Sequence, residues 1–178
     1  MVDVVALRNS DFWKKKFAKA CLMNDTNKSG TITRSDFELM IEKYQHTTER
    51  AKFESFSKNL LHFCDLCGLT DASVVQSYKE FEEQWLANIS QNKDMHLSMV
   101  YDLFQCLDVN GSSFIDLKEW TSHCDAMGVP AECAKESFNA IDKDNDGKIT
   151  LDEFVAYHAE FFYTTENKMN SAILFGPL

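Results

Sequence analysis

Acidic side chains at alternate positions make residues 142–153 the strongest chemical signal in the chain. Asp142, Asp144 and Asp146 are each separated by one residue, and Glu153 closes the segment. A hard divalent cation takes six to eight oxygen ligands, which alternating carboxylates, a backbone carbonyl and a final bidentate carboxylate can supply. The segment therefore predicts an oxygen-lined metal site.

The spacing of this segment is that of the calcium-binding loop of an EF-hand. In that loop the backbone carbonyl of Lys148 is the seventh-position ligand, Thr150 lies where a bridging water is usual, and Gly147 makes the sharp turn. Ile149 should form a short β bridge with a partner loop. An acidic turn without a metal is the alternative interpretation, and the completeness of the pattern speaks against it.

Residues 108–119 repeat this register with two departures. Ser112 offers a hydroxyl where a carboxylate or amide is usual, and Ser113 takes the turn position that glycine normally holds. A non-glycine residue at positive φ costs about 1 kcal/mol, so we expect a weaker site, with a vestigial loop as the alternative. The expected ligands are side chains at odd loop positions, one carbonyl and the closing carboxylate: Asp108, Asn110, Ser112, Phe114 (carbonyl), Asp116 (through water) and Glu119.

Residues 25–36 form a third copy, with Gly30 at the turn and the apolar Ile32 in place. The twelfth position is Asp36 instead of glutamate, and this shorter side chain binds through both oxygens only if the following helix moves in. A smaller, octahedral shell suits Mg²⁺, so we expect competition between Ca²⁺ and Mg²⁺ here, with an inactive loop as the alternative. The expected ligands follow the same positions: Asp25, Asn27, Ser29, Thr31 and Asp36.

EF-hands occur in pairs, and residues 69–80 occupy the place of a partner for the first loop. Leu69 takes the first ligand position and Val74 the turn position, so we predict an ion-free hand retained for packing. The side chains that remain as possible oxygen ligands are Asp71, Ser73 and Glu80. In the other loops the candidate carboxylates increase from the first to the third to the fourth, and affinity should increase in that order.

Helices must position these loops, because apolar residues along the chain recur at intervals of three and four. The sequence predicts an all-α, compact protein with four EF-hands in two paired lobes. Residues 1–92 would form the N-terminal pair and residues 93–178 the C-terminal pair, with a linker at 90–94. The eight predicted helices contain the apolar stripes at 13–21, 37–44, 53–67, 78–89, 100–107, 117–127, 134–141 and 151–158.

Composition restricts the possible partners. The chain has 178 residues, 44% of them hydrophobic, and a net charge of -10, which favours metal ions over nucleic acid or an anionic membrane. It contains no run of about 20 apolar residues and no apolar signal-peptide core at its start, so we expect no membrane span and a cytoplasmic location. No obligatory protein partner is predicted. The six cysteines are interpreted as reduced thiols.

The remaining conspicuous residues favour structural roles. Cys64 and Cys67 share the apolar stripe of one helix, so we interpret them as core residues rather than a zinc or redox site. The run at 14–16 is interpreted as a solvated lysine face. Four histidines, His62, His96, His123 and His158, are scattered without a catalytic partner at recognisable spacing, and no enzyme is predicted.

The C-terminal segment 172–178 is apolar where a free terminus would normally be polar, so we expect it to be docked. In an EF-hand sensor, the opened lobe exposes a Met-rich groove that accepts a target helix. A tail able to fill such a groove is already attached here, and phenylalanines outnumber methionines by 14 to seven. These features favour a closed buffer over a sensor.

The whole chain resembles the invertebrate sarcoplasmic calcium-binding proteins, which have four hands with a degenerate second one. The most specific shared features are Ser10-Asp11-Phe12-Trp13, the closure of the first loop at 32–37, and the end at 175–178. The resemblance implies a cytosolic Ca²⁺/Mg²⁺ buffer of muscle or neuron that holds ions in hands one, three and four.

The vacant second hand also resembles the coelenterazine photoproteins and luciferin-binding proteins. That resemblance implies a chromophore cavity between the lobes, which Trp13, Trp85, Trp120, Tyr157 and His158 could line. A histidine in the first helix and an aromatic terminal segment with a final proline are not matched. A calexcitin-like calcium sensor of the same fold is a third possibility.

Overall fold

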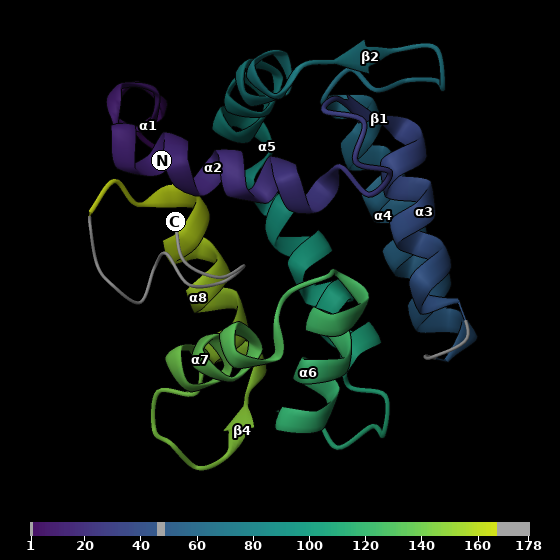
Figure 1. Cartoon of the computed structure of the whole chain (residues 1–178), viewed down its shortest axis with the longest axis vertical. Coiled ribbons are helices and arrows are strands. Elements are labelled where there is room, and N and C mark those ends of the chain that lie inside the picture. The colour runs from purple at the N-terminus through teal and green to yellow at the C-terminus, as the bar shows by residue number, and fades with distance from the viewer. Residues whose placement is uncertain (1, 46–48, 167–178) are drawn as a thin grey trace.

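A computed structural model describes residues 2–45 and 49–166 of the chain (Figure 1). The C-terminal segment 172–178, which we expect to be docked, lies outside these residues. None of the helices in the described ranges is long and apolar enough to cross a membrane. The elements are α1 (Val4–Asn9), α2 (Asp11–Asn24), β1 (Ile32–Thr33), α3 (Arg34–Tyr44), α4 (Arg50–Leu66), β2 (Val75–Gln76), α5 (Tyr78–Leu107), β3 (Ile115–Asp116), α6 (Leu117–Ala126), α7 (Ala131–Ile141), β4 (Lys148–Ile149) and α8 (Leu151–Tyr163).

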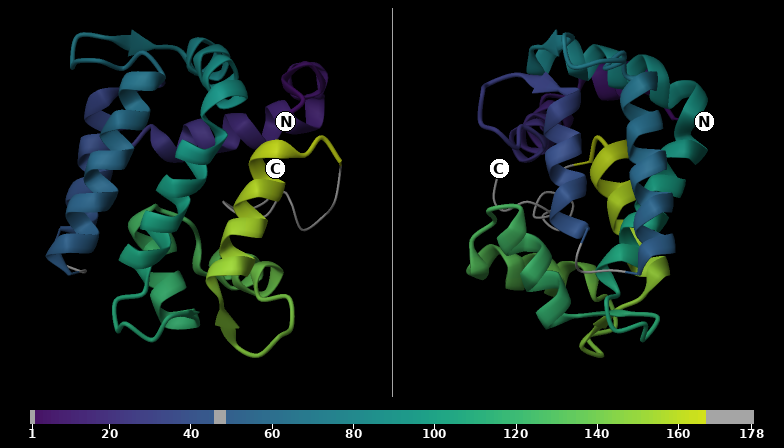
Figure 2. Two further views of the ribbon diagram at one scale, coloured as in Figure 1. Left: turned by 180° about the vertical axis from the view of Figure 1, so that it is seen from behind. Right: turned by 90° about the vertical axis from the view of Figure 1, so that its right-hand side faces the viewer.

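The predicted linker at 90–94 coincides with a kink that separates two helical segments of α5. Only Asn92 has non-helical backbone angles, with φ -120° and ψ 31°, and it marks a kink. The segment is polar but contains neither glycine nor proline, and the chain bends at Asn92 without forming a separate loop. Figure 2 shows α5 running from the end of the molecule that carries β2 toward the end that carries β4, and it packs against both α4 and α8.

The all-α fold is confirmed, with eight helices in the described residues. All eight predicted stripes lie in helices, and those at 78–89 and 100–107 share α5 on either side of its kink. The additional helix is the short α1, which begins where the Asp3 carboxylate accepts the N–H of Ala6 at 2.9 Å. Its six residues contain a single buried side chain, Leu7, so the sequence shows no helical period of apolar residues there. Ser10 separates it from α2 and caps that helix by accepting the N–H of Trp13 at 3.1 Å.

Two short antiparallel β bridges pair the loops. Ile32 lies opposite Gln76, and Ile115 lies opposite Ile149, which confirms the bridge expected for Ile149. The three isoleucines are fully buried and anchor the loops to the core. The first loop is thereby joined to residues 69–80, and the third loop to the fourth.

The cysteine pair of α4 and its C-cap belongs to the core, as predicted. Cys64 and Cys67 are both fully buried, and all six cysteines are free thiols. Burial raises the pKa of the Cys64 thiol to about 12, so it stays protonated at neutral pH. A redox or metal role for this pair would require a thiolate, and burial disfavours that form.

The start of α2 is tied to the end of α8, a contact that the sequence did not indicate. Trp13 Nε1 donates to the carbonyl of Phe162 at 2.7 Å, and Lys16 Nζ donates to the carbonyl of Thr164 at 3.0 Å. Lys16 is fully buried, so it is not part of a solvated lysine face. Burial outweighs the attraction of Glu160 and lowers the pKa of Lys16 to about 8. Its charge lies at the helix C-terminus, where a cation is stabilising.

Candidate metal sites and an interior cavity

Three of the four loops share one backbone geometry. In each of them the fourth and sixth positions have positive φ, and within residues 69–80 no residue does. Such angles allow the sharp turn that directs successive side chains toward one point. The values are 57° and 81° for Lys28 and Gly30, 69° and 70° for Gly111 and Ser113, and 58° and 83° for Asn145 and Gly147.

The carboxylate at the first loop position is held by backbone amides in all three loops. In the fourth loop, Asp142 accepts the N–H of Asp146 at 3.2 Å and the N–H of Gly147 at 3.0 Å. Asp25 and Asp108 accept the corresponding amides of their own loops. All three carboxylates are buried, so their orientation is fixed before any ion arrives.

The carboxylate at the twelfth position accepts hydrogen bonds from both the early and the late part of its loop, and in this sense it spans the loop. Glu153 accepts the N–H of Lys143 at 2.8 Å and the N–H of Thr150 at 2.9 Å, and it completes the capping box of α8. Burial pushes its pKa upward, but these hydrogen bonds outweigh burial and the pKa lies below its ordinary value. Glu119 spans the third loop in the same way.

Asp36 spans the first loop despite its shorter side chain. Its carboxylate accepts the N–H of Asn27 at 3.2 Å and the N–H of Thr33 at 2.9 Å, and the residue is fully buried. The start of α3 therefore lies close enough for an aspartate to reach the opposite side of the loop. This short, fixed carboxylate is suited to one-oxygen binding of a small cation.

The fourth loop contains the most concentrated negative charge of the predicted ligands. Asp142, Asp144 and Asp146 each bring one carboxylate oxygen within 4.8 Å of the others. Like charges this close disfavour one another unless a cation lies between them. In the third loop, by contrast, Asp116 caps α6 by accepting the N–H of Glu119 at 2.8 Å. The ligand roles of the residues in all three loops stay predictions.

Replacing Ser113 with glycine is expected to stabilise the protein. Ser113 has a φ of 70°, and removal of its side chain relieves a strain of about 1 kcal/mol while its amide bond to Asp108 remains. Urea unfolding of Ser113→Gly in the metal-free state measures the gain. Ser90→Gly, within α5, is the control and should lose about 0.5 kcal/mol, since glycine is a weaker helix former than serine. A loss in both variants would contradict the strain.

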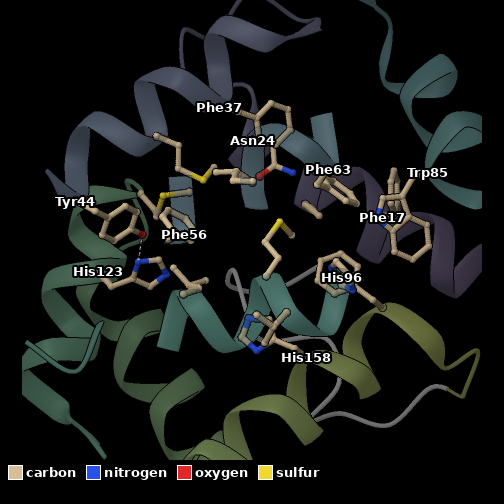
Figure 3. Close-up of a pocket in the computed structure, with 18 of the residues that line it drawn as sticks. Phe17, Asn24, Phe37, Tyr44, Phe56, Phe63, Trp85, His96, His123 and His158 are labelled. Atoms are coloured by element: carbon tan, nitrogen blue, oxygen red, sulfur yellow. Dashed lines mark hydrogen bonds between the residues drawn. The ribbon is translucent and has the colours of Figure 1, made fainter. Parts of the chain in front are cut away.

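A cavity of about 110 Å³ lies in the interior, among α2 to α6 and α8 (Figure 3). Of the five residues proposed to line a chromophore cavity, Trp85, Trp120 and His158 do so. Trp13 and Tyr157 are not among the lining residues, and Trp13 packs behind Trp85 with ring centroids 5.8 Å apart. The other lining side chains are predominantly aromatic or aliphatic.

Three histidines that look scattered in the sequence converge on this cavity. His96, His123 and His158 come from α5, α6 and α8 and line its walls, with His96 and His158 buried and His123 half-buried (Figure 3). His123 Nδ1 is hydrogen-bonded to the hydroxyl of Tyr44 at 2.7 Å, and His96 Nδ1 to that of Tyr163. His158 Nδ1 donates to the Phe154 carbonyl at 2.8 Å, which leaves its Nε2 as an acceptor.

Acidification is expected to destabilise the metal-free protein through these histidines. Burial lowers the pKa of His96 and His123 to about 3 and that of His158 to about 4, against 6.5 in an unfolded chain. The unfolded state therefore binds more protons in this window. Stability is fully present above pH 6.5 and falls below it by about 1.4 kcal/mol per pH unit for each histidine.

Urea unfolding of the metal-free protein between pH 6.5 and about pH 5 measures this slope. His123→Gln should reduce the slope by the share of one histidine, because an amide binds no proton in this range. His62→Gln is the matched control at a position that does not line the cavity. An unchanged slope in His123→Gln would show that His123 titrates normally.

Comparison with known proteins identifies the class. Residues 97–159, which contain the third and fourth loops, match the family model described as an EF-hand domain pair. This match makes residues 97–159 an EF-hand pair, and the paired loops and helices of the N-terminal half have the same arrangement.

More particularly, the chain is similar to calcium-binding and luciferin-binding proteins of this fold. It is 27% identical over 157 residues to sarcoplasmic calcium-binding proteins I, III and IV of Branchiostoma lanceolatum, covering 80% of this chain and 84% of that protein. It is 23% identical over 161 residues to the luciferin-binding protein of Renilla reniformis, covering 86% and 88%. A match to clytin of Clytia gregaria, 34% identical over 100 residues, spans 53% of this chain and only 49% of clytin.

Comparison with solved structures finds similar folds in the same group of proteins. The solved structure of the coelenterazine-binding protein from Renilla muelleri, in its calcium-loaded apo form, superposes with a TM-score of 0.73. The superposition covers 100% of both chains at 20% sequence identity, so it shows a shared fold. The resemblance expected from the sequence, to sarcoplasmic calcium-binding proteins and to luciferin-binding proteins, is confirmed.

Proposed function

We propose that this EF-hand protein binds Ca²⁺ reversibly in its first, third and fourth loops and acts as a Ca²⁺/Mg²⁺ buffer. The observation that carries the proposal is the common geometry of the three loops. Each has paired positive φ values, a first carboxylate fixed by amides and a twelfth carboxylate that spans the loop. Little rearrangement of the backbone is then needed to take up an ion.

Competition by Mg²⁺ is proposed mainly for the first loop. Asp36 offers a short, buried carboxylate there, and the other candidate carboxylate is Asp25. Mg²⁺ requires a compact octahedral shell and retains several waters, so few protein charges suffice. The bridged pairs support a working division into residues 1–92 and 93–178, each as one EF-hand pair.

Calorimetric titration with Ca²⁺, with and without millimolar Mg²⁺, tests the proposal. We expect three sites per chain, and Mg²⁺ should weaken apparent Ca²⁺ binding most at the first loop. A metal-free protein that takes up no Ca²⁺ would overturn the proposal. If Mg²⁺ does not weaken Ca²⁺ binding at any of three sites, the protein binds Ca²⁺ specifically and is not a Ca²⁺/Mg²⁺ buffer.

A second candidate function, binding of a coelenterazine-type luciferin, is favoured by the cavity. Its aromatic walls and three histidines offer stacking surfaces and hydrogen-bonding groups to an aromatic heterocycle. The cavity measures about 110 Å³, whereas pockets for such ligands span roughly 300–1,000 Å³. The interior would have to expand to take up such a ligand, whereas the ion loops are already formed, and this contrast is our reason for proposing the buffer first.

Absorbance distinguishes the two candidates. Protein incubated with coelenterazine and then separated from free compound should show no chromophore band if it is a buffer alone. A stoichiometric band that is lost when Trp85 is replaced by alanine would establish the luciferin-binding function. The variant Trp13→Ala, which alters a tryptophan behind the cavity wall, is the matched control.

A further inference from the structure

The two N-terminal loops exchange contacts through the residue at their tenth position. Tyr78, from the second loop, donates its hydroxyl to Oδ2 of Asp25 in the first loop at 2.8 Å. In return Arg34, from the first loop, donates to the carbonyl of Leu69 in the second loop at 3.0 Å. Leu69 is the residue that replaces the first ligand.

The C-terminal pair has no side chains able to make this exchange. Its two tenth positions are Leu117 and Leu151, which have no hydrogen-bonding group. The first carboxylates of those loops, Asp108 and Asp142, are held by amides and side chains of their own loops. The tyrosine contact is therefore specific to the first site.

The contact adds a donor from outside the first loop to the hydrogen bonds that hold Asp25. Oδ2 accepts two hydrogen bonds, from the Gly30 amide at 2.7 Å and from Tyr78 at 2.8 Å. Oδ1 accepts the Ser29 amide at 2.9 Å and a longer contact from the Ser29 hydroxyl at 3.4 Å. Of these donors, Tyr78 is the one that belongs to the second loop, so its removal changes the hold on Asp25 without altering the first loop itself.

The positive charge of Arg34 is held beside the second loop by two contacts. Its guanidinium bridges the Leu69 carbonyl and the carboxylate of Asp65, at 3.0 Å and 2.5 Å. This positive charge lies beside the position where the second loop would begin to bind an ion. The second loop is thus held in place without a metal of its own, and Tyr78 is held with it.

We propose that Tyr78 is a positioning residue for the first metal site, so that the ion-free second hand supplies the outer shell of its neighbour. The proposal rests on the proposed binding of an ion by the first loop. Outer-shell partners that orient a ligand typically change metal affinity by about 10- to 100-fold when removed. For one hydrogen bond to an exposed loop, we expect about a 10-fold loss.

Nuclear magnetic resonance of two glycine amides tests the proposal on the full chain. The amides of Gly30 and Gly147 donate to the first carboxylates of the first and fourth loops, so each reports its own site. In a Ca²⁺ titration of Tyr78→Phe, the Gly30 signal should respond at about 10-fold higher free Ca²⁺ than in the unmodified protein. The Gly147 signal should titrate unchanged.

Tyr101→Phe is the matched control, because Tyr101 lies half-exposed on the same helix and away from the loops. It should leave both glycine titrations as they are. A Gly30 titration within twofold of the unmodified protein in Tyr78→Phe would overturn the positioning role. An equal loss at Gly30 and Gly147 would overturn it too, because it would indicate a general loss of structure.

Failure of the proposed function gives a different result. If the Gly30 signal of the unmodified protein does not respond to Ca²⁺ or Mg²⁺, the first loop binds no ion, and both proposals fail for this site. If it responds equally in the unmodified protein and in Tyr78→Phe, metal binding stands and only the role of Tyr78 is rejected.

Discussion

Removing the bound metal with a chelator is expected to lower the free energy of unfolding by about 4 kcal/mol for each occupied site. This value applies when free Ca²⁺ is about 1,000 times the dissociation constant, so three sites would contribute about 12 kcal/mol. Part of the effect is electrostatic, because three Ca²⁺ ions would reduce the net charge from -10 to -4. Urea unfolding in excess Ca²⁺ and in chelator measures the difference.

Two conditions separate ion capture from general salt screening. Added NaCl at the same ionic strength should recover little of the lost stability, since a monovalent ion does not satisfy the carboxylate shells. The stabilisation should also increase with the logarithm of free Ca²⁺. Equal stability in chelator and in Ca²⁺ would show that the loops do not bind the ion in the folded state.

Replacing Glu153 with glutamine is expected to abolish binding at the fourth loop and to reduce the calorimetric stoichiometry by one. Glu153 closes the loop and carries the last carboxylate, and an amide cannot supply two anionic oxygens. Outer-shell changes alone cost 10- to 100-fold in affinity, so loss of this ligand should cost roughly 100-fold or more. The capping role of the side chain can be retained in part by the glutamine.

The variant Glu136→Gln provides the control with the same charge change. Glu136 is exposed on α7 and lies outside the loops, so its replacement should leave all sites intact. The Gly147 amide should lose its response to Ca²⁺ in Glu153→Gln while the Gly30 amide keeps its own. Three undiminished sites in Glu153→Gln would contradict the assignment of this ligand.

The loops could be predicted from the sequence because their determinants are local. Twelve consecutive residues contain the acids, the turn residue and the bridging isoleucine, and the structure reproduces the turn even at Ser113, with φ 70°. The missing first ligand of the second loop is equally readable, since Leu69 has no side-chain oxygen, and the structure buries this residue fully. The residue types and their spacing along the chain are therefore enough to predict the geometry of these loops.

The interior could not be predicted in the same way, because its residues are distant in the chain. His96, His123 and His158 lie on three helices, and only tertiary packing brings them to one cavity. Lys16 belongs to a run of three lysines, and only the end of α8 distinguishes it from its neighbours. The partnership of Tyr78 with Asp25 depends on the β bridge between their loops.

The contacts between α2 and α8 connect two of the candidate ion sites through two helices. Helix α2 ends at Asn24, next to Asp25, and α8 begins two residues before Glu153. Trp13 and Lys16 join the opposite ends of these helices, so the first and fourth loops lie at the ends that are not joined. Any influence of occupancy at one of these loops on affinity at the other must be reciprocal.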